Sequence, residues 1–456
     1  MFRSVTGIRM MSSSPEKHLD IVIVGGSLAG LFAGTSLRRL GHNVVILERS
    51  PTPLLHDQGA GIVAGNETRA FLARHDRTRR EYAVTSRLRL HLDQHGGIIQ
   101  KENSVQQMTS WDLVYHLLRA NFDAVGSDYL NGAEPPKPNS NEGIGKYEFG
   151  RKVEAVEEAE NNKVSISWSN TRQDQTSPSE GTVQADLLLA ADGPSSKIRS
   201  LLPSISNISP LPPRTYAGYV AFRGTVPESQ LPPPESCSPS SNRSPTSAFL
   251  EQFTFFHGPS TQILAYTIPG PPGSLNPNTR LINWVWYVNY PWPDPSTPSS
   301  AFNSLMTDTT THQTHRYTLP PTAKLPPEIW SSIRQRARDI LPPQFSFLVQ
   351  HTQHPFVQAI TDVPPPSSSS SPGPTSRYLN DRIILIGDAL SQFRPHTAAS
   401  TSQAALHALL LEQVVVGRMT WDDYDEYVMQ FAREVQRSGV SMGEQSQFGV
   451  HPLQQE

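Results

Sequence analysis

DIVIVGGSLAGLFAGTSLRRLGHNVVILER, residues 20–49, is the stretch from which the architecture of this 456-residue chain can be inferred. Residues 21–24 form an unbroken apolar run rich in β-branched side chains, which is typical of a parallel strand buried on both faces. Gly25 and Gly26 end this run, and apolar residues at helical spacing follow them. A second apolar run covers residues 44–47. The pattern predicts a βαβ unit with a tight first turn.

The turn has most of a dinucleotide-binding motif. Gly25 and Gly30 fill the first and third glycine positions, whereas Ser27 takes the second. Such a turn presents free backbone N–H groups and a helix N-terminus to a pyrophosphate, and Glu48 lies where a carboxylate can bind a ribose hydroxyl. The unit by itself is compatible with NAD or FAD, and the alternative is an ordinary βα turn. The residues expected to hold the dinucleotide here are Gly25, Gly26, Ser27, Gly30, Glu48 and Arg49.

Composition excludes several functions. The net charge is −3 with 38 basic and 41 acidic residues, so there is no electrostatic argument for nucleic-acid binding. Cys237 is the single cysteine, which fits a reducing compartment. No apolar run approaches the roughly 18 residues of a membrane span. We therefore expect a cytoplasmic protein without a membrane partner. Residues 1–19 are expected to be a disordered tail, with a transit peptide as the alternative.

The 41 prolines are concentrated in a few segments. Residues 231–247 and 364–375 are rich in proline and serine and cannot contribute to a core. We expect both to be solvated loops or disordered inserts, and a role as proline-motif ligands is the less favoured reading.

Further along the chain, five places offer additional cofactor contacts. A loop centred on Gly59 and Gly61 can let the backbone approach a flat ring. Ser110 is a suitable N-cap for a helix that carries Arg119 at its end. A buried strand at residues 187–191 precedes Asp192 and Gly193, and another at residues 382–386 precedes Gly387 and Asp388; a helix is expected to begin at Ser400. Carboxyl ends of strands are where open α/β sheets bind ligands.

Between these parts lies a region of a different character. Aromatic, β-rich segments at residues 215–224, 249–256, 262–268 and 281–290 predict an antiparallel sheet in a second domain. Helices are expected at residues 326–341 and 421–437. The expected division is a tail at 1–19, an FAD-binding domain at 20–86, 105–212 and 378–456 with the C-terminal helices, a hairpin at 87–104, and a substrate domain at 213–377.

This arrangement favours FAD over NAD. FAD is long, and a fold that holds its ADP half near Gly25 needs distant groups for the ribityl chain and the ring. The late strand ending in Asp388 supplies a carboxylate for ribityl hydroxyls. The helix N-terminus at Ser400 supplies partial positive charge beside the flavin pyrimidine ring, where a reduced flavin is negative. An NAD enzyme has no need of this return of the chain.

The chain resembles the single-component FAD-dependent aromatic hydroxylases, the family of p-hydroxybenzoate and salicylate hydroxylases, from residue 20 to residue 443. Three motifs occur in the family's order: the glycine-rich turn, Asp192-Gly193, and Gly387-Asp388. Finer matches resemble the 2,6-dihydroxypyridine hydroxylase branch. They are G-A-G-I at residues 59–62, S-W-D at 110–112, G-Y-V-A-F-R-G at 218–224, N-W-V-W-Y at 283–287, P-F-V-Q-A-I-T-D at 355–362 and R-P-H at 394–396.

The resemblance implies an α/β fold with a discontinuous Rossmann-like FAD-binding domain, an antiparallel substrate domain and a C-terminal helix. It implies that Asp388 binds the ribityl chain, that Arg119 reaches the cofactor, and that Pro395 covers the flavin. It also implies that NAD(P)H reduces the flavin after docking transiently, with NADPH favoured by family habit. O2 then forms a C4a-hydroperoxide that hydroxylates an electron-rich aromatic or heteroaromatic small molecule. The sequence departs from the branch at Leu390, Ser391, Ser400 and His407.

Four residues are expected at the catalytic centre: Pro395 over the flavin, and His396, Arg394 and Tyr219 at the substrate. His396 follows Pro395 in the loop over the flavin, and its pKa class suits proton exchange near neutral pH. It either helps to ionise the substrate or only braces the loop, and the two readings have equal weight. Arg394 is the neighbouring residue suited to holding an anionic substrate. Tyr219 is the next choice for an activating base.

Other functions remain open at this point. Trp284 and Trp286 resemble the W-x-W of flavin-dependent halogenases, although the following residues do not continue that motif. An FAD oxidase or reductase of the same fold is a second alternative, and a redox-silent flavin-binding scaffold is a third. No metal site is expected, because no histidines are paired at a ligand spacing. The protein is expected to be a monomer or a homodimer.

Overall fold

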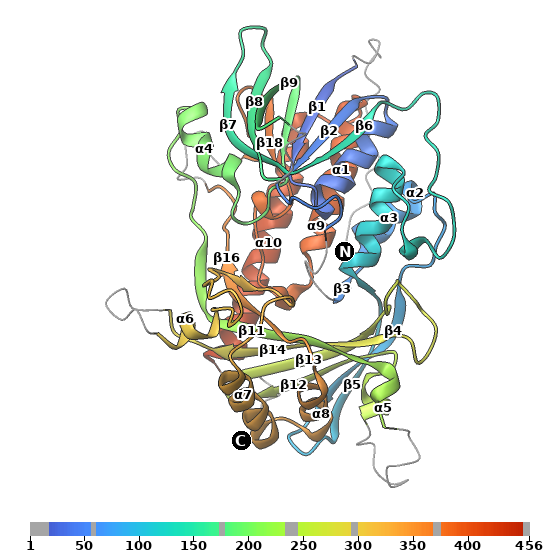
Figure 1. Ribbon diagram of the computed structural model, residues 1–456, viewed down its shortest axis with the longest axis vertical. Helices are drawn as coiled ribbons and strands as arrows, with labels where there is room; N and C mark the ends of the chain where they lie inside the picture. The colour runs from blue at the N-terminus through green and yellow to red at the C-terminus, as the bar shows by residue number, and fades with distance from the viewer. Residues whose placement is uncertain are drawn as a thin grey trace.

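The computed structural model describes residues 18–55, 61–172, 178–232, 245–292, 300–367 and 375–449. The expectations for residues 1–17, for Gly59, for Cys237 and for most of the two proline- and serine-rich segments lie outside these residues. Figure 1 shows a six-stranded sheet at the top, a nine-stranded sheet below it, and helices between and around them.

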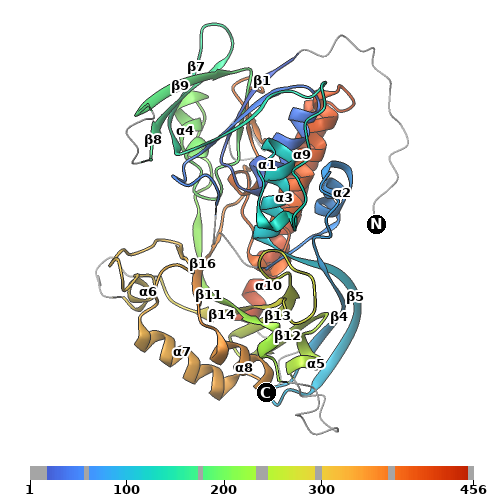
Figure 2. The same ribbon diagram turned by 45° about the vertical axis from the view of Figure 1, so that its right-hand side comes forward.

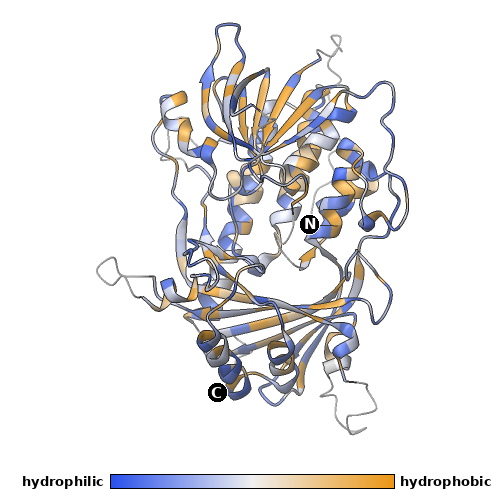
Figure 3. Cartoon of the chain, in the orientation of Figure 1, coloured by the Kyte–Doolittle hydropathy of each residue, from blue (hydrophilic) through white to orange (hydrophobic). Residues whose placement is uncertain are grey.

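In the six-stranded sheet, the four central strands are the apolar runs that the sequence predicts, whereas the edge strands β6 and β17 are more polar. Its strands lie in the order β17-β18-β10-β1-β2-β6, and all neighbours are parallel except β17 and β18. The strands are β1 (Asp20–Val24), β2 (Asn43–Glu48), β6 (Gly145–Phe149), β10 (Leu187–Ala190), β17 (Arg377–Tyr378) and β18 (Ile383–Leu385). Figure 3 shows mostly hydrophobic colour in the central strands of this sheet, which is typical of strands covered on both faces.

Two layers cover this sheet. Figure 2 shows α1 (Leu28–Arg39), α3 (Trp111–Asp123) and α9 (Ser400–Val415) together on one side. On the other side lies a three-stranded antiparallel sheet with the short helix α4 (Lys197–Ile205). Its strands are β7 (Arg151–Glu158), β8 (Val164–Asn170) and β9 (Glu180–Ala185). The carboxyl ends of β1, β10 and β18 lie together at one edge of the sheet. A ligand site is expected at that edge.

The nine-stranded sheet has the order β15-β16-β11-β14-β13-β12-β4-β5-β3. Its strands are β3 (Gly61–Val63), β4 (Val84–Leu92), β5 (Ile98–Ser110), β11 (Thr215–Pro227), β12 (Gln252–Gly258), β13 (Thr261–Ile268), β14 (Leu281–Asn289), β15 (Thr318–Leu319) and β16 (Phe356–Asp362). The expectation of a purely antiparallel sheet is wrong at one place, because β12 pairs with β4 in parallel. These two strands are distant in sequence, so no local turn dictates their direction.

Two expected element bounds also need correction. The hairpin expected at residues 87–104 is longer, since β4 and β5 together run from Val84 to Ser110 and β5 leads directly into α3. The strand expected at residues 249–256 begins only at Gln252, because the short helix α5 (Pro245–Phe249) precedes it. Aromatic residues favour strands without fixing where they start.

The nine-stranded sheet has one face in a hydrophobic core and one face toward the rest of the molecule. Side chains alternate between the two faces along each strand. Trp284 and Trp286 on β14 pack with Phe345 in the core under helices α7 (Pro327–Ile340) and α8 (Pro343–His351). Their neighbours Val285 and Tyr287 point to the opposite face. That opposite face is turned toward the six-stranded sheet.

The last helix links the two halves. Helix α10 (Trp421–Gln447) begins with a capping box between Thr420 and Asp423, and it extends ten residues past the predicted end at residue 437. It packs on α9 at one end and on β13 and β14 at the other. The remaining helices are α2 (Asn66–His75) and α6 (Ala301–Leu305). Among the helices of the described segments, none is both long and apolar enough to cross a membrane.

Candidate active site

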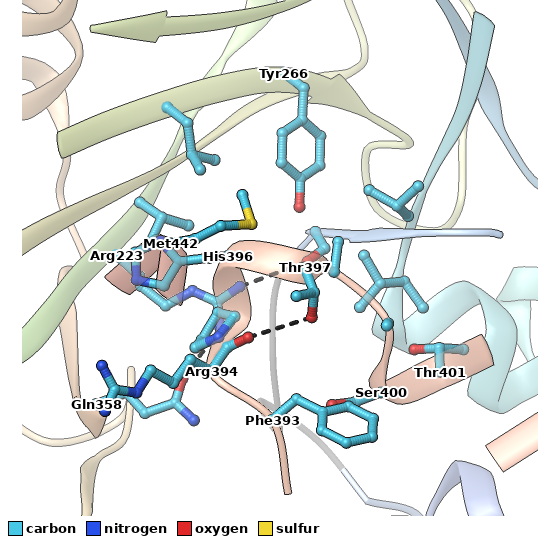
Figure 4. A pocket seen from close by; sticks show the side chains of 18 of the residues that line it. Arg223, Tyr266, Gln358, Phe393, Arg394, His396, Thr397, Ser400, Thr401 and Met442 are labelled. Atoms are coloured by element: carbon cyan, nitrogen blue, oxygen red, sulfur yellow. Dashed lines mark hydrogen bonds between the residues drawn. The ribbon is translucent and has the colours of Figure 1, made fainter. Parts of the chain in front are cut away.

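A cavity of about 790 Å³ lies between the parallel sheet and the exposed face of the nine-stranded sheet. Its upper wall includes the start of α1, the turn after β18 and the start of α9. Its lower wall includes side chains from β4, β5, β11, β12, β13, β14 and β16, and the last turns of α10 close one side. Figure 4 shows Tyr266 pointing into this space from one side, opposite Ser400 and Phe393. One continuous space therefore joins the glycine-rich turn to the aromatic sheet.

The turn between β1 and α1 has the geometry that a dinucleotide requires. Gly25 has a positive φ of 104°, and a Cβ there would lie 2.4 Å from the carbonyl oxygen of Ala191. A Cβ at Gly30 would lie 2.0 Å from the carbonyl oxygen of Gly25, so only glycine lets α1 approach β1 this closely. Ser27, the residue before α1, lines the cavity, and its hydroxyl makes no capping bond. It is free to face a ligand, as the sequence predicted.

Glu48 lies beside this turn. Its Oε2 accepts the Gly26 N–H at 2.8 Å, and its Oε1 accepts the Ser50 N–H at 2.8 Å. The Tyr147 hydroxyl donates to the Gly26 carbonyl at 3.1 Å. The carboxylate is thus held at the N-terminal end of α1, where a ribose hydroxyl can reach it.

The Gly387-Asp388 turn and the start of α9 lie next to each other on the upper wall of the cavity. Gly387, Asp388 and Ser400 all line the cavity. Burial raises the pKa of Asp388 to about 6, although hydrogen bonding to Ser400 and the charge of Arg214 act in the opposite direction. Hydroxyl groups of a polyol chain beside this carboxyl group would offset the desolvation by donating hydrogen bonds to it.

His407, one of the departures from the family pattern, holds this turn from behind. Its Nδ1 accepts the Gly387 N–H at 3.0 Å, and burial lowers its pKa to about 3. A neutral imidazole can accept this bond, so the replacement keeps the turn in place. Of the other departures, Leu390 is buried in the core and the Ser391 hydroxyl donates to the Val363 carbonyl at 3.0 Å.

Gly61 and Gly193 line the cavity, and Gly25, Gly26, Gly30 and Glu48 form or adjoin the turn beside it, but the side chains of three other predicted cofactor residues lie elsewhere. Arg49 is exposed at the end of β2. The Asp192 carboxylate accepts the N–H groups of Lys197 and Ile198 at 2.7 and 3.2 Å, and so it caps α4. Sequence reasoning placed these residues near a strand end without fixing where their side chains point.

Arg119 is the third predicted residue outside the cavity. It is 4% exposed, pairs with Asp123 at 2.9 Å and donates to the Pro53 carbonyl at 2.8 Å. Its guanidinium also stacks on the Tyr147 ring at 3.7 Å, and Tyr147 contacts Gly26. Arg119 therefore braces the back of the dinucleotide turn in this structure.

His396 lines the cavity, yet both of its ring nitrogens already have partners. Nε2 lies 2.9 Å from the Tyr219 hydroxyl, and Nδ1 lies 2.9 Å from Gln262 Oε1. Burial, with a smaller contribution from the charge of Arg394, lowers its pKa to about 3. The geometry favours the bracing reading of His396 over the base. Pro395 lines the cavity beside it, whereas Tyr219 is fully buried behind it.

Arg394 reaches the cavity wall, but its charge is already neutralised. It donates to Asp362 through Nε and Nη2 at 2.8 to 3.1 Å and to Glu444 through Nη1 at 2.8 Å. Although burial acts against it, hydrogen bonding to Asp362 raises the pKa of Arg394. The expectation that Arg394 holds an anionic substrate has no support from these contacts, because Arg394 links β16 to α10.

The sequence analysis did not single out several residues on the lower wall. Arg223 on β11, Tyr266 on β13, Gln358 on β16 and Met442 on α10 all line the cavity. Figure 4 shows Arg223, Gln358 and Met442 on the same side as His396. Arg223 and Gln358 lie within motifs quoted above, and alternation along a strand places Arg223 on the face opposite Phe222. The missing information was which face of the sheet the cavity would use.

Comparisons with known proteins agree with this geometry. A family model described as FAD binding domain-like matches residues 216–362. The chain is 27% identical over 401 residues to the 2,6-dihydroxypyridine 3-monooxygenase of Paenarthrobacter nicotinovorans, covering 86% of this chain and 82% of that protein.

Solved structures show the same fold. The 2,6-dihydroxypyridine-3-hydroxylase from Arthrobacter nicotinovorans superimposes with a TM-score of 0.73 at 23% identity, covering 96% of this chain and 94% of that one. HpxO of Klebsiella pneumoniae, complexed with FAD and uric acid, has a TM-score of 0.62 at 17% identity, with 95% and 90% coverage. A salicylate hydroxylase substrate complex has a TM-score of 0.63 at 17% identity, with 96% and 90% coverage.

Proposed function

The chain belongs to the FAD-dependent aromatic hydroxylases and is an FAD-dependent monooxygenase, and from this premise we propose that it uses NAD(P)H and O2 to hydroxylate a small, electron-rich aromatic or heteroaromatic ring. The observation that carries the proposal is the single cavity between the two sheets. It is bounded by cofactor-type groups on one wall and by aromatic and polar side chains on the other.

The residues present fit FAD. The narrow turn at Gly25 and Gly30 admits a pyrophosphate, and Glu48 is available to the ribose beside it. Asp388 would accept ribityl hydroxyls, and the N-terminus of α9 would lie at the flavin ring. When bound, FAD supplies the redox chemistry that activates O2. In this proposal, the discontinuous FAD-binding part supplies one wall of the cavity and the substrate part supplies the other.

The protein itself contributes orientation and exclusion of water. The aromatic sheet face presents Tyr266 and Tyr287 to a planar ring, and α10 closes the side of the cavity with Met442. The η5 turn (Pro395–Thr397) passes over the space where the flavin ring is expected. A dry, shaped cavity prevents loss of the activated oxygen to water and so keeps the reaction coupled.

The test is the rate of NAD(P)H oxidation by the yellow, FAD-loaded protein across phenols, hydroxypyridines and indoles. Hydrogen peroxide release and product formation are measured in the same samples. We expect at least one ring to accelerate NAD(P)H oxidation, with less peroxide released than NAD(P)H consumed and one oxygen atom added to the product.

Three results would contradict the proposal in different ways. Product formation that needs halide would indicate a halogenase, and peroxide equal to NAD(P)H with every ring would indicate an oxidase. Protein that purifies without FAD and does not take it up would indicate a scaffold. Parallel assays with NADH and NADPH decide the electron donor.

A further inference from the structure

Arg223 is a cationic side chain on the cavity wall with few partners. It lies on β11, where alternation directs it to the cavity, and its guanidinium packs 5.3 Å from the centre of the Phe356 ring. Its Nη1 lies 3.3 Å from Gln358 Oε1 and its Nη2 lies 3.5 Å from the Gly61 carbonyl oxygen. Both bonds are long for a charged donor. Among the described residues, no carboxylate pairs with it and its buried Nε has no partner.

The other charged groups on the cavity wall have partners of their own. Arg394 is held by Asp362 and Glu444. Arg89 lies 3.9 Å from Glu102, and both line the cavity on the neighbouring strands β4 and β5. Asp388 interacts with Ser400 and Arg214 on the opposite wall. Of the three arginines on this wall, Arg223 is the one for which no carboxylate of the described residues lies within ion-pair distance.

The surroundings of Arg223 suit a flat ring. Its positive charge acts on Tyr266 and Tyr287, two buried phenols on the same sheet face whose pKa values are raised by desolvation. The Tyr266 hydroxyl points into the cavity in Figure 4. Leu264 and Val285 add apolar surface between them. A partly buried guanidinium without an anion is costly, so a ligand that brings one is favoured.

We propose that Arg223, supported by Gln358, is the specificity-determining residue that binds an anionic oxygen group of the aromatic substrate. The inference rests on the proposed function and names the substrate class within it: a planar ring that carries a carboxylate or an ionised ring hydroxyl. A planar guanidinium matches a carboxylate in two parallel hydrogen bonds and stabilises a phenolate through one.

The test measures binding to oxidised, FAD-loaded protein without NAD(P)H, through the change in the flavin absorbance spectrum and by calorimetry. The probes are matched pairs: 2-, 3- and 4-hydroxybenzoate against the corresponding hydroxybenzamides, and 4-nitrophenol at pH values above and below its own ionisation. We expect wild-type protein to bind an anionic member roughly 10- to 100-fold more tightly than its neutral partner, the range of a charge-assisted hydrogen bond.

Arg223→Gln should bring the members of each pair to nearly equal affinity, while Arg223→Lys should keep part of the preference. Arg336→Gln is the control, because Arg336 also packs on an aromatic ring, that of Trp286, but lies on helix α7 outside the cavity lining, and it should leave the preference unchanged. Retained flavin shows that the variants are folded. A carboxylate preference and a phenolate preference are separated by the two kinds of pair.

Three outcomes would overturn the inference. They are equal affinity of wild-type protein for charged and neutral partners, a preference that survives in Arg223→Gln, and absence of binding by every anionic probe. Because hydroxylation is not part of the measurement, failure of the proposed activity would leave a distinct signature: anion-selective binding without substrate-stimulated NAD(P)H oxidation.

Discussion

At the scale of single residues, the cavity wall contains ionisable groups whose environment suppresses their charge. Desolvation raises the pKa of Asp388 to about 6 and lowers the pKa values of His396 and His407 to about 3. Each shift disfavours the charged form, as burial does. The three groups have different roles. The Asp388 carboxyl group faces the cavity, whereas the imidazoles of His396 and His407 hold loops in place.

Asp388 should couple FAD binding to pH. Ribityl hydroxyls donate to a carboxylate but less well to a carboxylic acid, so FAD affinity of the flavin-free protein should fall as the pH drops below about 6. Asp388→Ala should weaken FAD binding by about 1.5–3 kcal/mol, the value of a charge-assisted bond. Asp388→Asn should remove the pH dependence. Flavin titration at pH 5 to 8 measures both, and wild-type affinity in Asp388→Ala would remove the residue from the site.

His396 should behave as a structural residue. Since its folded pKa is about 3 and the unfolded value is about 6.5, the unfolded chain takes up a proton first as the pH falls. Its contribution to stability should therefore be lost from pH 6.5 downward. His396→Ala breaks contacts to Tyr219 and Gln262 and should cost about 1–3 kcal/mol.

The measurement that separates the two roles of His396 is the pH profile of kcat/KM. If His396 only braces the loop, kcat/KM should depend on pH between pH 5 and 8 in the same way in His396→Ala as in the wild type. Loss of a limb from that profile, with FAD retained and peroxide released, would instead identify His396 as the group that ionises the substrate.

At the scale of elements, the contact between β1 and α1 determines whether the dinucleotide turn can form. Gly30→Ala would put a Cβ against the carbonyl oxygen of Gly25, which belongs to backbone and cannot swing away. We expect a loss of about 1–3 kcal/mol of stability and of most bound FAD. Chemical denaturation and the ratio of flavin to protein absorbance measure the two effects.

Gly34→Ala on the same helix is the matched control. Its added Cβ would lie 3.1 Å from Ile46 Cδ1 and Phe122 Cε2, and these side-chain atoms can adjust. The gain of about 1 kcal/mol in helix propensity opposes that crowding. We expect near wild-type flavin content, and an equal loss in both variants would show that the Gly25 contact has no special role.

At the scale of the whole molecule, Arg394 joins three parts: its own loop after β18, Asp362 at the end of β16, and Glu444 on α10. Arg394→Gln leaves the buried Asp362 without its cation and should cost about 3–5 kcal/mol. Glu444→Gln, at the half-exposed partner, should cost about 0–1 kcal/mol. Denaturation of the FAD-loaded proteins compares them. Equal costs would mean that the link between the halves does not depend on the buried pair.

Much of the fold follows from the sequence because its signals are local. The apolar runs before Gly25 and Gly387 correspond to strands buried on both faces, and the helical spacing of apolar residues after Gly26 predicts helix α1. Glycine at positions 25 and 30 is required by the backbone itself. The dinucleotide turn could therefore be predicted from residues close together in the chain, whereas the preference for FAD over NAD also depended on the distant strand before Asp388.

The tertiary structure decided what the side chains do. The direction of β12 beside β4, the cavity face of β11 and the length of α10 depend on contacts between residues far apart in sequence. The sequence predicted Arg394 as the residue for an anion and did not single out Arg223, yet the fold brings Asp362 and Glu444 to Arg394. Whether a charged side chain can bind a ligand depends on its neighbours in space, because an ion pair within the protein already satisfies its charge.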